Sequence, residues 1–361
     1  MTKRVILEPP RRVSIRDVAR ESGASITTVS LVLNKASLAQ RLAPATRRRV
    51  EEVAQRLDYT ADPVAKSLRT RQSHTVGIMI FDLTDPYCTR LLKGIEASLI
   101  QTTYLPLIMS MQNEVDLLKR YWKLMIERRI EGVLVVANWP SLDINAFQAF
   151  ERRACVMIGT EPPKGTDISY VTVDNIDGGA KAMAYLHELG HKKIAVLRGP
   201  GNIEDSARRW QGIQQAANQA GIELDPRLCP EMNILPHPNS IVEEADRVVS
   251  ALIAQKLPFT AMLTFDDLSA AGALRALDRC GLQVPQDCSL IGFDDIPYAK
   301  LVQPSLTTIR QPLEEMGAIA VENLLAQIGR KLDDPPTETL STRVKAELVI
   351  RESTRALKRK A

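Results

Sequence analysis

The spacing of hydrophobic and polar residues changes near residue 75, and this change divides the chain in two. Before it, apolar residues recur every three or four positions, which is typical of short amphipathic helices. After it, continuous apolar runs alternate with longer helical patterns, which is typical of buried parallel strands joined by helices. We therefore expect a helical head at 1–60, a hinge helix and linker at 61–74, a body at 75–353 and a basic tail at 354–361.

Two helices joined by a tight turn are predicted between Ser14 and Asn34. Ser14 and Asp17 form a capping pair for the first helix, and Ser25 is a good N-cap for the second. Gly23 supplies the positive φ that a turn between crossed helices needs. This pattern indicates a helix-turn-helix, whose second helix lies in the major groove of DNA. An ordinary pair of packed helices is the alternative interpretation.

The charge distribution favours the DNA-binding interpretation. Residues 1–74 contain 15 lysines and arginines against 7 acidic residues, whereas the remainder contains 32 against 36. A third helix is predicted from Pro44 to Leu57, with Arg47, Arg48 and Arg49 in its first turn. Cations are disfavoured there by the helix dipole, and a DNA phosphate would relieve the conflict. A solvated charged face is the alternative for each of these arginines.

Seven apolar runs in the body predict strands, and their number favours two doubly wound sheets over one. Polar residues just past the strand ends are then the candidates for a ligand site. The runs are VGIMIF (76–81), LPLIMS (105–110), GVLVVA (132–137), CVMIG (155–159), KIAVL (193–197), AMLTF (261–265) and SLIGF (289–293).

Composition argues against several other classes of protein. Five cysteines without C-x-x-C spacing indicate neither a disulfide framework nor a zinc site. No apolar segment approaches the roughly 20 residues that span a bilayer, and no signal-peptide core is evident, so we expect a cytoplasmic protein without a membrane association. His187 to His191 spells H-E-x-x-H, but Gly190 should end the helix before the second histidine. We find no catalytic motif, and we expect no metal and no cofactor.

The order of short motifs resembles the lactose-repressor (LacI/GalR) family of transcription regulators across about residues 13–353. The motifs are SIRDVARESGASITTVS, TRRRVEEVAQRLDY, PVAKSLRT, DLTDPYCTRLLKGIE, VTVDN, ELGHKKIAVL, RRWQG, VPQDCSLIGFDDIP and QPSLTTIRQP. The resemblance implies a homodimer that binds a palindromic operator under the control of a small molecule. The alternative is a periplasmic-type sugar-binding protein without DNA function, although such a protein should lack the head.

The resemblance also implies particular DNA contacts. Ile26, Thr27 and Leu31 match base-reading positions, whereas Ser25, Thr28, Ser30 and Asn34 match positions near phosphates. For the hinge, the resemblance implies that Leu68 is wedged into the minor groove, with Ala65 and Lys66 against the groove wall. The apolar reading surface lacks arginine and glutamine, so thymine methyl groups and DNA shape should contribute to specificity.

For the body, the resemblance implies a periplasmic-binding-protein-like fold whose chain crosses between subdomains near 174, 300–310 and 330–340. The N-subdomain is expected at about 75–173 and 303–332, and the C-subdomain at about 174–302 and 333–353. A sugar or sugar derivative should bind between them, because carboxylates and a guanidinium form paired hydrogen bonds with hydroxyl groups. The implied effector-binding residues are Phe81, Asp82, Tyr87, Cys88, Arg209, Asp266, Asp294 and Gln311. For Asp82, a helix-capping role is the alternative.

Three departures from the family pattern carry consequences. Asp266 stands where asparagine is common, which makes the expected pocket more acidic and disfavours an acidic effector. The segment Lys35–Ala43 is about three residues longer than usual, and Ala43 replaces a serine cap, at a cost of roughly 1 kcal/mol of helix stability. The tail lacks a leucine heptad, so it does not indicate a tetramer.

Overall fold

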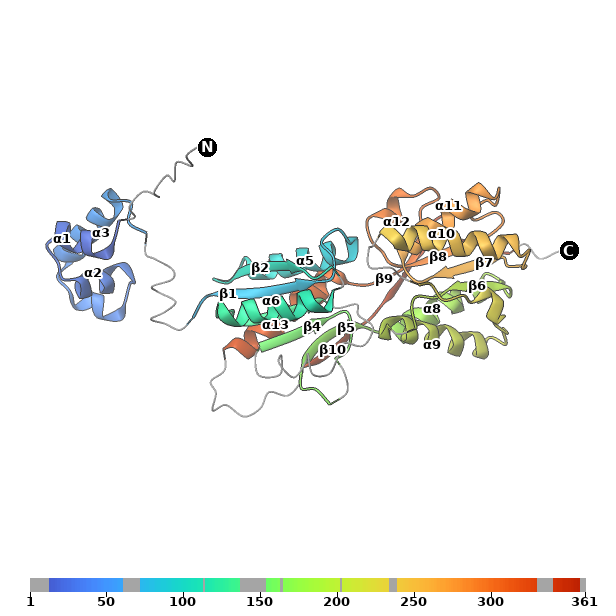
Figure 1. Cartoon of the computed structure of the whole chain (residues 1–361), viewed down its shortest axis with the longest axis horizontal. Helices are drawn as coiled ribbons and strands as arrows, with labels where there is room; N and C mark the ends of the chain where they lie inside the picture. The colour runs from blue at the N-terminus through green and yellow to red at the C-terminus, as the bar shows by residue number, and fades with distance from the viewer. Residues whose placement is uncertain are drawn as a thin grey trace, which may run out of the picture. The chain divides into compact units, whose positions relative to one another are not determined.

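The computed structural model describes residues 13–60, 72–112, 114–136, 154–162, 165–201, 203–233, 239–329 and 340–357. The chain forms two compact units, which meet in sequence between Ser73 and His74. The first unit contains the helical head and the second contains the α/β body (Figure 1). Within the described ranges, no helix combines the length and hydrophobicity that crossing a bilayer requires.

The described part of the head, residues 13–60, contains three α-helices and one short 3-10 helix. They are α1 (Ile15–Ser22), α2 (Ile26–Leu33), η1 (Ser37–Arg41) and α3 (Pro44–Arg56). Val18, Val29 and Val50 are completely buried, one from each α-helix, so the three helices share one small core. Gly23 adopts a φ of 60° at the end of α1, which confirms the predicted turn.

The caps of the head agree with the sequence pattern. The Asp17 carboxylate accepts hydrogen bonds from the backbone N–H and the hydroxyl of Ser14. Ser25 accepts a hydrogen bond from the backbone N–H of Thr28, at 3.1 Å, and so caps α2. Ala43 provides no side-chain cap to α3. The N-terminus of α3 therefore lacks a side-chain acceptor of its own.

The first sheet of the body has six parallel strands in the order β10-β5-β4-β3-β1-β2. Val76, Ile78 and Ile80 alternate with Met79, and the two sets belong to separate cores on opposite faces. Helices α5 and α13 cover one face, and α6 covers the other (Figure 1). The elements are β1 (Thr75–Ile80), α5 (Pro86–Leu99), β2 (Leu105–Ser110), α6 (Val115–Glu127), β3 (Gly132–Val136), β4 (Ala154–Ile158), β5 (Ser169–Val173), α13 (Leu313–Ile328) and β10 (Ser341–Val344).

The second sheet has five strands in the order β11-β9-β8-β7-β6, and only β11 is antiparallel to its neighbour. Helices α8 and α9 pack together beside it, and so do α10 and α11 (Figure 1). The elements are α8 (Asn175–Glu188), β6 (Ile194–Leu197), α9 (Glu204–Gln219), η2 (Pro226–Leu228), α10 (Asn239–Ala254), β7 (Ala261–Thr264), α11 (Asp267–Arg279), β8 (Ser289–Asp294), α12 (Tyr298–Leu301), β9 (Thr307–Arg310) and β11 (Glu347–Val349).

Three very short links join the two sheets. Only Asp174 separates β5 from α8, residues 311–312 separate β9 from α13, and residues 345–346 separate β10 from β11. The expected crossings near 300–310 and 330–340 were therefore placed too early. Because β9 pairs with β8, it belongs to the second sheet, and because β10 pairs with β5, it belongs to the first. Both strands are only four residues long, and neither produces a strong apolar run.

Helices α5 and α13 approach each other so closely that Gly94 has no room for a side chain. A Cβ atom at Gly94 would lie 1.9 Å from the backbone oxygen of Glu314. The Glu314 carboxylate also pairs with Arg90 and Lys93 of α5, at 3.0 and 3.1 Å. The contact between these two helices therefore depends on backbone proximity, and it anchors the long helix that follows the second link.

We predict that Gly94→Ala destabilises the body. The forced separation of α5 and α13 should outweigh the improved helix propensity and lower the free energy of unfolding by about 1–3 kcal/mol. Urea unfolding followed by circular dichroism measures this change. Gly329→Ala is the matched control, because its Cβ would meet no heavy atom closer than 3.7 Å. Equal unfolding midpoints for the two variants would contradict the close-packing explanation.

Candidate functional site

Helix α2 presents one face to solvent and buries the other. Val29 and Val32 lie in the head core, whereas Ser25, Ile26 and Thr27 are exposed. Ile26 is 47% exposed, although it is a large apolar residue at the start of the helix. Of the other predicted DNA-contacting residues on this helix, Thr28, Ser30 and Leu31 are half-buried. The exposed face thus begins at the helix N-terminus, the end that contacts bases in helix-turn-helix proteins.

The polar residues expected near phosphates also hold the ends of α2. The hydroxyls of Ser25 and Thr28 lie 2.9 Å apart within hydrogen-bonding distance. The Asn34 side chain donates to the backbone oxygen of Ser30, at 2.7 Å. These residues therefore keep their side chains at the surface while they stabilise the helix. The predicted hinge residues Ala65, Lys66 and Leu68 lie outside the described residues.

A basic surface lies at the start of α3. Pro44 occupies the first turn, where its missing N–H is not needed, and Arg48 and Arg49 are exposed while Arg47 is half-buried. With no acidic residue in the first turn and no side-chain cap, the exposed guanidinium groups of Arg48 and Arg49 remain available to an anion.

The body contains a cavity of about 530 Å³, a volume that includes space open to solvent, and its lining comes from both subdomains. Phe81 and Tyr87 follow β1, and their rings stack with centroids 6.2 Å apart. Apolar side chains and four aspartates complete the wall around a single arginine. The lining residues are Phe81, Asp85, Tyr87, Asp205, Arg209, Ile241, Phe265, Asp266, Leu268, Asp294 and Ile296.

Arg209 is held rigidly beside this cavity. Its Nε donates to the Asn175 side-chain oxygen at 2.8 Å, and its Nη1 donates to the Phe265 carbonyl at 2.7 Å. The guanidinium carbon lies 3.7 Å from the centroid of the Phe293 ring. Its Nη2 is 3.7 Å from Asp294 Oδ1, which is an ion pair without a hydrogen bond. The arginine therefore contributes positive charge from a fixed position.

The aspartates around the cavity are difficult to ionise. Burial raises the pKa of Asp294 to about 8, although Arg209 opposes the shift, and Asp266 adds repulsion. Burial likewise raises the pKa of Asp85 to about 7, with repulsion from Asp266 as a further cause. Burial raises the pKa of Asp205 to about 7 and also raises that of Asp266. Burial in this cavity therefore destabilises the ionised form of these aspartates.

Of the eight residues predicted for the effector site, five line the cavity: Phe81, Tyr87, Arg209, Asp266 and Asp294. The other three occupy different positions. Asp82 accepts hydrogen bonds from the backbone and hydroxyl of Thr84, so it stabilises a turn. Cys88 is a buried residue of α5 and belongs to the hydrophobic core. Gln311, which directly follows β9, donates to Asp294 Oδ1 at 2.5 Å and so positions that carboxylate.

The sequence interpretation missed Asp85 and Asp205. Asp85 caps α5 by accepting from the Tyr87 backbone, whereas we had assigned the binding role to the preceding Asp82. The dipeptide Asp85-Pro86 is a recognisable helix start, and it could have identified the acid that lines the cavity. Asp205 stands one helical turn before Arg209 on α9, a spacing that places both side chains on the same face. It accepts a hydrogen bond from Asn175, at 3.1 Å.

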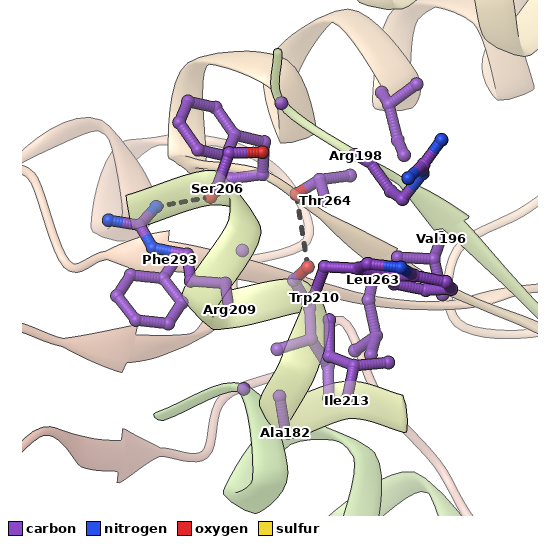
Figure 2. Close-up of a pocket in the computed structure, with 16 residues that line it drawn as sticks. Ala182, Val196, Arg198, Ser206, Arg209, Trp210, Ile213, Leu263, Thr264 and Phe293 are labelled. Carbon is purple, nitrogen blue, oxygen red and sulfur yellow. Dashed lines mark hydrogen bonds between the residues drawn. The ribbon is translucent and has the colours of Figure 1, made fainter. Parts of the chain in front are cut away.

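A second cavity, of about 400 Å³, lies in the C-subdomain and shares Arg209 and Phe265 with the first. Figure 2 shows Ser206, Arg209 and Phe293 on its left and Val196 and Arg198 on its right. Its lining is mainly apolar, and Arg198 lies 5.1 Å from the Trp210 ring centroid. Arg209 and Phe265 therefore belong to the walls of both spaces.

The H-E-x-x-H pattern does not form a metal site. Helix α8 ends at Glu188, and Gly190 adopts a φ of 88°, so His191 lies beyond the helix as expected. The His191 ring is buried and contacts Thr260 Oγ1 at 2.9 Å and the Arg355 carbonyl at 3.1 Å. Across the described ranges, no cluster of three or more histidine, cysteine or acidic side chains is suited to hold a metal ion.

Comparisons with known proteins agree with this arrangement of head and body. Residues 14–62 match the model of bacterial regulatory proteins of the lacI family, and residues 183–354 match the periplasmic binding protein-like domain. The chain is 31% identical over 344 residues to the transcriptional repressor CytR of Escherichia coli K12, covering 95% of this chain and 97% of that protein. The chain belongs to the LacI family.

Further similarities extend over nearly the whole LacI-family chain. It is 30% identical over 345 residues to the transcriptional repressor PurR of Pasteurella multocida, covering 95% of this chain and 99% of the relative. The lac repressor dimer bound to operator and the anti-inducer ONPF matches with a TM-score of 0.82 and 25% identity, covering 96% of this chain and 100% of that chain. The protein is a DNA-binding transcriptional regulator controlled by a small-molecule effector. A periplasmic-type sugar-binding protein has no support in these comparisons.

The raised pKa of Asp85 predicts a pH-dependent stability. Between about pH 4 and 7 the unfolded chain loses the Asp85 proton while the folded chain retains it, so stability falls as pH rises through this window. Asp85→Asn keeps a capping side chain but removes the ionisable group, and with it the fall in stability as pH rises. At each pH, the free energy of unfolding of the unsubstituted protein is subtracted from that of the variant. This difference should increase by about 1 kcal/mol or more from pH 4 to pH 8. Denaturant titrations at both pH values measure it, and parallel profiles would contradict the assignment.

Proposed function

We propose that this LacI-family protein is a dimeric repressor that binds a palindromic operator. The observation that carries the proposal is the exposed face of α2, where Ile26 and Thr27 are free to meet bases and Ser25 is free to meet a phosphate, while the opposite face forms the head core. Thr28, Ser30, Leu31 and Asn34 complete the proposed contact surface, and Arg48 and Arg49 supply phosphate contacts. Ala65, Lys66 and Leu68 retain their proposed minor-groove role. A cytoplasmic location follows, because the operator DNA is there.

We further propose that a sugar or sugar derivative occupies the 530 Å³ cavity and controls operator affinity. Arg209 and the aspartates provide paired partners for hydroxyl groups, and the stacked rings of Phe81 and Tyr87 provide a face for a sugar ring. A matching structure is the transcriptional regulator CelR in complex with cellobiose, with a TM-score of 0.69 and 25% identity. The match covers 95% of this chain and 100% of that chain, and cellobiose is a sugar, which supports the proposed class.

The proposed dimer uses the edge of the first sheet. Leu105, Leu107 and Ile108 of β2 are 70%, 42% and 44% exposed, although all three are large apolar residues. Strand β2 pairs with β1 on one side and is the last strand in the sheet order. An exposed, apolar edge strand is a surface that proteins usually cover. Because repressors of this family form dimers, we infer that a second copy of the chain covers β2.

The proposed operator contacts predict a separation of specific from non-specific binding. Ile26→Ala should weaken binding to an operator selected from a randomised duplex pool by about tenfold, because an apolar base contact is lost, but should change binding to a scrambled duplex little. Arg48→Ala is the contrasting variant: it should weaken both and reduce the salt slope by about one. Fluorescence anisotropy across a series of salt concentrations measures both. Operator binding that does not depend on salt concentration would contradict the proposal, because phosphate contacts release counterions.

The proposed interface predicts that Leu107→Glu converts the dimer into a monomer. A charge placed on the apolar edge strand would have to be buried without a partner, which strongly disfavours association. Sedimentation velocity of the full chain distinguishes the two masses. Leu38→Glu introduces the same charge at an exposed leucine of the head, 52% exposed, and should leave the dimer intact. A Leu107→Glu variant that remains dimeric would place the interface elsewhere.

A further inference from the structure

One ion pair joins the two subdomains beside the proposed effector cavity. Glu161 follows β4 in the N-subdomain, which is built on the first sheet, and Arg208 belongs to α9 in the C-subdomain, which is built on the second. The Arg208 Nη2 atom donates to Glu161 Oε2 at 2.7 Å. Because the two residues belong to different subdomains, this pair forms only while the subdomains lie close together.

Helix α9 presents this pair and the cavity on neighbouring stripes. Residues four positions apart lie on the same side of a helix. Asp205 and Arg209 line the cavity, whereas Glu204 and Arg208 form the adjacent stripe, from which Arg208 contacts Glu161. A ligand that binds Asp205 or Arg209 therefore acts on the same turns of helix that carry the ion pair.

Each member of the pair has a second partner within its own subdomain. The other carboxylate oxygen of Glu161, Oε1, accepts from Arg343 Nε of β10 at 2.9 Å. Arg208 Nε donates to Glu204 Oε1, also at 2.9 Å. Separation of the subdomains would therefore leave neither charge without a partner. Breaking an ion pair is costly mainly when it strands an unpaired buried charge, and this arrangement avoids that cost.

The pair is also accessible enough to water to break and re-form. The side chains of Glu161 and Arg208 are 16% and 27% exposed. A completely buried ion pair is costly to open, whereas an exposed pair contributes little to stability. Intermediate exposure is suited to a contact that exists in one arrangement of the subdomains and is lost in another.

A second contact between the subdomains follows the same plan. Arg90 of α5 donates through Nη1 to the carbonyl of Asp295, at 3.4 Å, in the C-subdomain. It also donates through Nη2 to Glu314 of α13, at 3.0 Å, within its own subdomain. Asp295 directly follows Asp294, which lines the cavity. This contact too lies one residue away from the proposed ligand site.

We propose that the Glu161–Arg208 pair is a latch that holds the two subdomains together around the effector cavity. The effector changes operator affinity by shifting the fraction of molecules in which the pair is formed. A ligand that binds one of two arrangements better shifts the population toward that arrangement. The inference rests on the proposed function and deepens it, because it names the contact through which the same cavity regulates DNA binding. It does not depend on which sugar binds.

Distances between spin labels test the latch without any ligand. One label is attached to Cys280, which is exposed in the C-subdomain, and the other to Lys123→Cys, at an exposed position of α6 in the N-subdomain. The other four cysteines are buried. Double electron–electron resonance is recorded on the full chain mixed with an excess of unlabelled chain, so that distances within one chain dominate. Glu161→Gln and Arg208→Gln should each shift and broaden the distance distribution.

The flanking partners provide matched controls. Arg343→Gln and Glu204→Gln each remove an ion pair within one subdomain and leave the bridge in place. Both should leave the distance distribution unchanged. Glu161→Gln combined with Arg208→Gln should change it no more than either substitution alone, because both remove the same contact. A general loss of packing would instead produce larger changes in the double variant.

Operator binding by the same variants connects the latch to regulation. The two bridge variants should change the Kd for the selected operator in the same direction, by about fivefold or more, as expected for a coupling between distant sites. The two control variants should leave this Kd unchanged. Fluorescence anisotropy with labelled operator measures all four.

Several results would overturn the proposal. They are a distance distribution that the bridge variants do not change, an equal change in the controls, an additive change in the double variant, and an operator Kd that the bridge variants leave unaltered. Salt-dependent operator binding by the unsubstituted protein would then leave the repressor function standing without the latch. Absence of that binding would count against the proposed function itself, whatever the distances show.

Discussion

The fixed guanidinium of Arg209 is the interaction on which the effector region depends. It comes from α9, receives its orientation from Asn175 at the start of α8, and donates to the Phe265 carbonyl just after β7. It also stacks on Phe293 of β8 and lies close to Asp294. The Arg209 side chain therefore contacts residues at the start of α8 and at the ends of β7 and β8. Because a lysine has neither the planar group nor the paired donors, it could not make the same set of contacts.

Much of the fold follows from the sequence because its signals are local. All seven apolar runs correspond to strands, and Gly23 and Ser25 fix the turn of the head without help from distant residues. Strands β5, β9, β10 and β11 were missed because polar residues interrupt their apolar runs, and β10 and β11 are not fully buried. Their positions depend on which neighbours they pair with. That pairing is a tertiary property, so the second and third crossings were placed too early.

The candidate site shows the same division between local and distant signals. Arg209, Asp266 and Asp294 were identified from the family motifs, and they do line the cavity. The choice between Asp82 and Asp85 depended on how the chain turns before α5, and the turn gives the cap and the cavity position to Asp85. No sequence pattern reveals that Asp85, Asp205, Asp266 and Asp294, which come from distant parts of the chain, line one cavity. That property emerges only when separate strand ends come together.

The links between the two sheets contain one, two and two residues. A pair of extended residues spans only about 7 Å, so three such links prevent the sheets from moving apart. Ala346 in the third link is completely buried, and its carbonyl accepts a hydrogen bond from Lys181 on α8. Torsion-angle changes at so few bonds allow rotation about the line of the links but little translation. A ligand that bridges the cavity would therefore limit how far the two subdomains rotate toward each other about these links. The size of that ligand would set the angle between them.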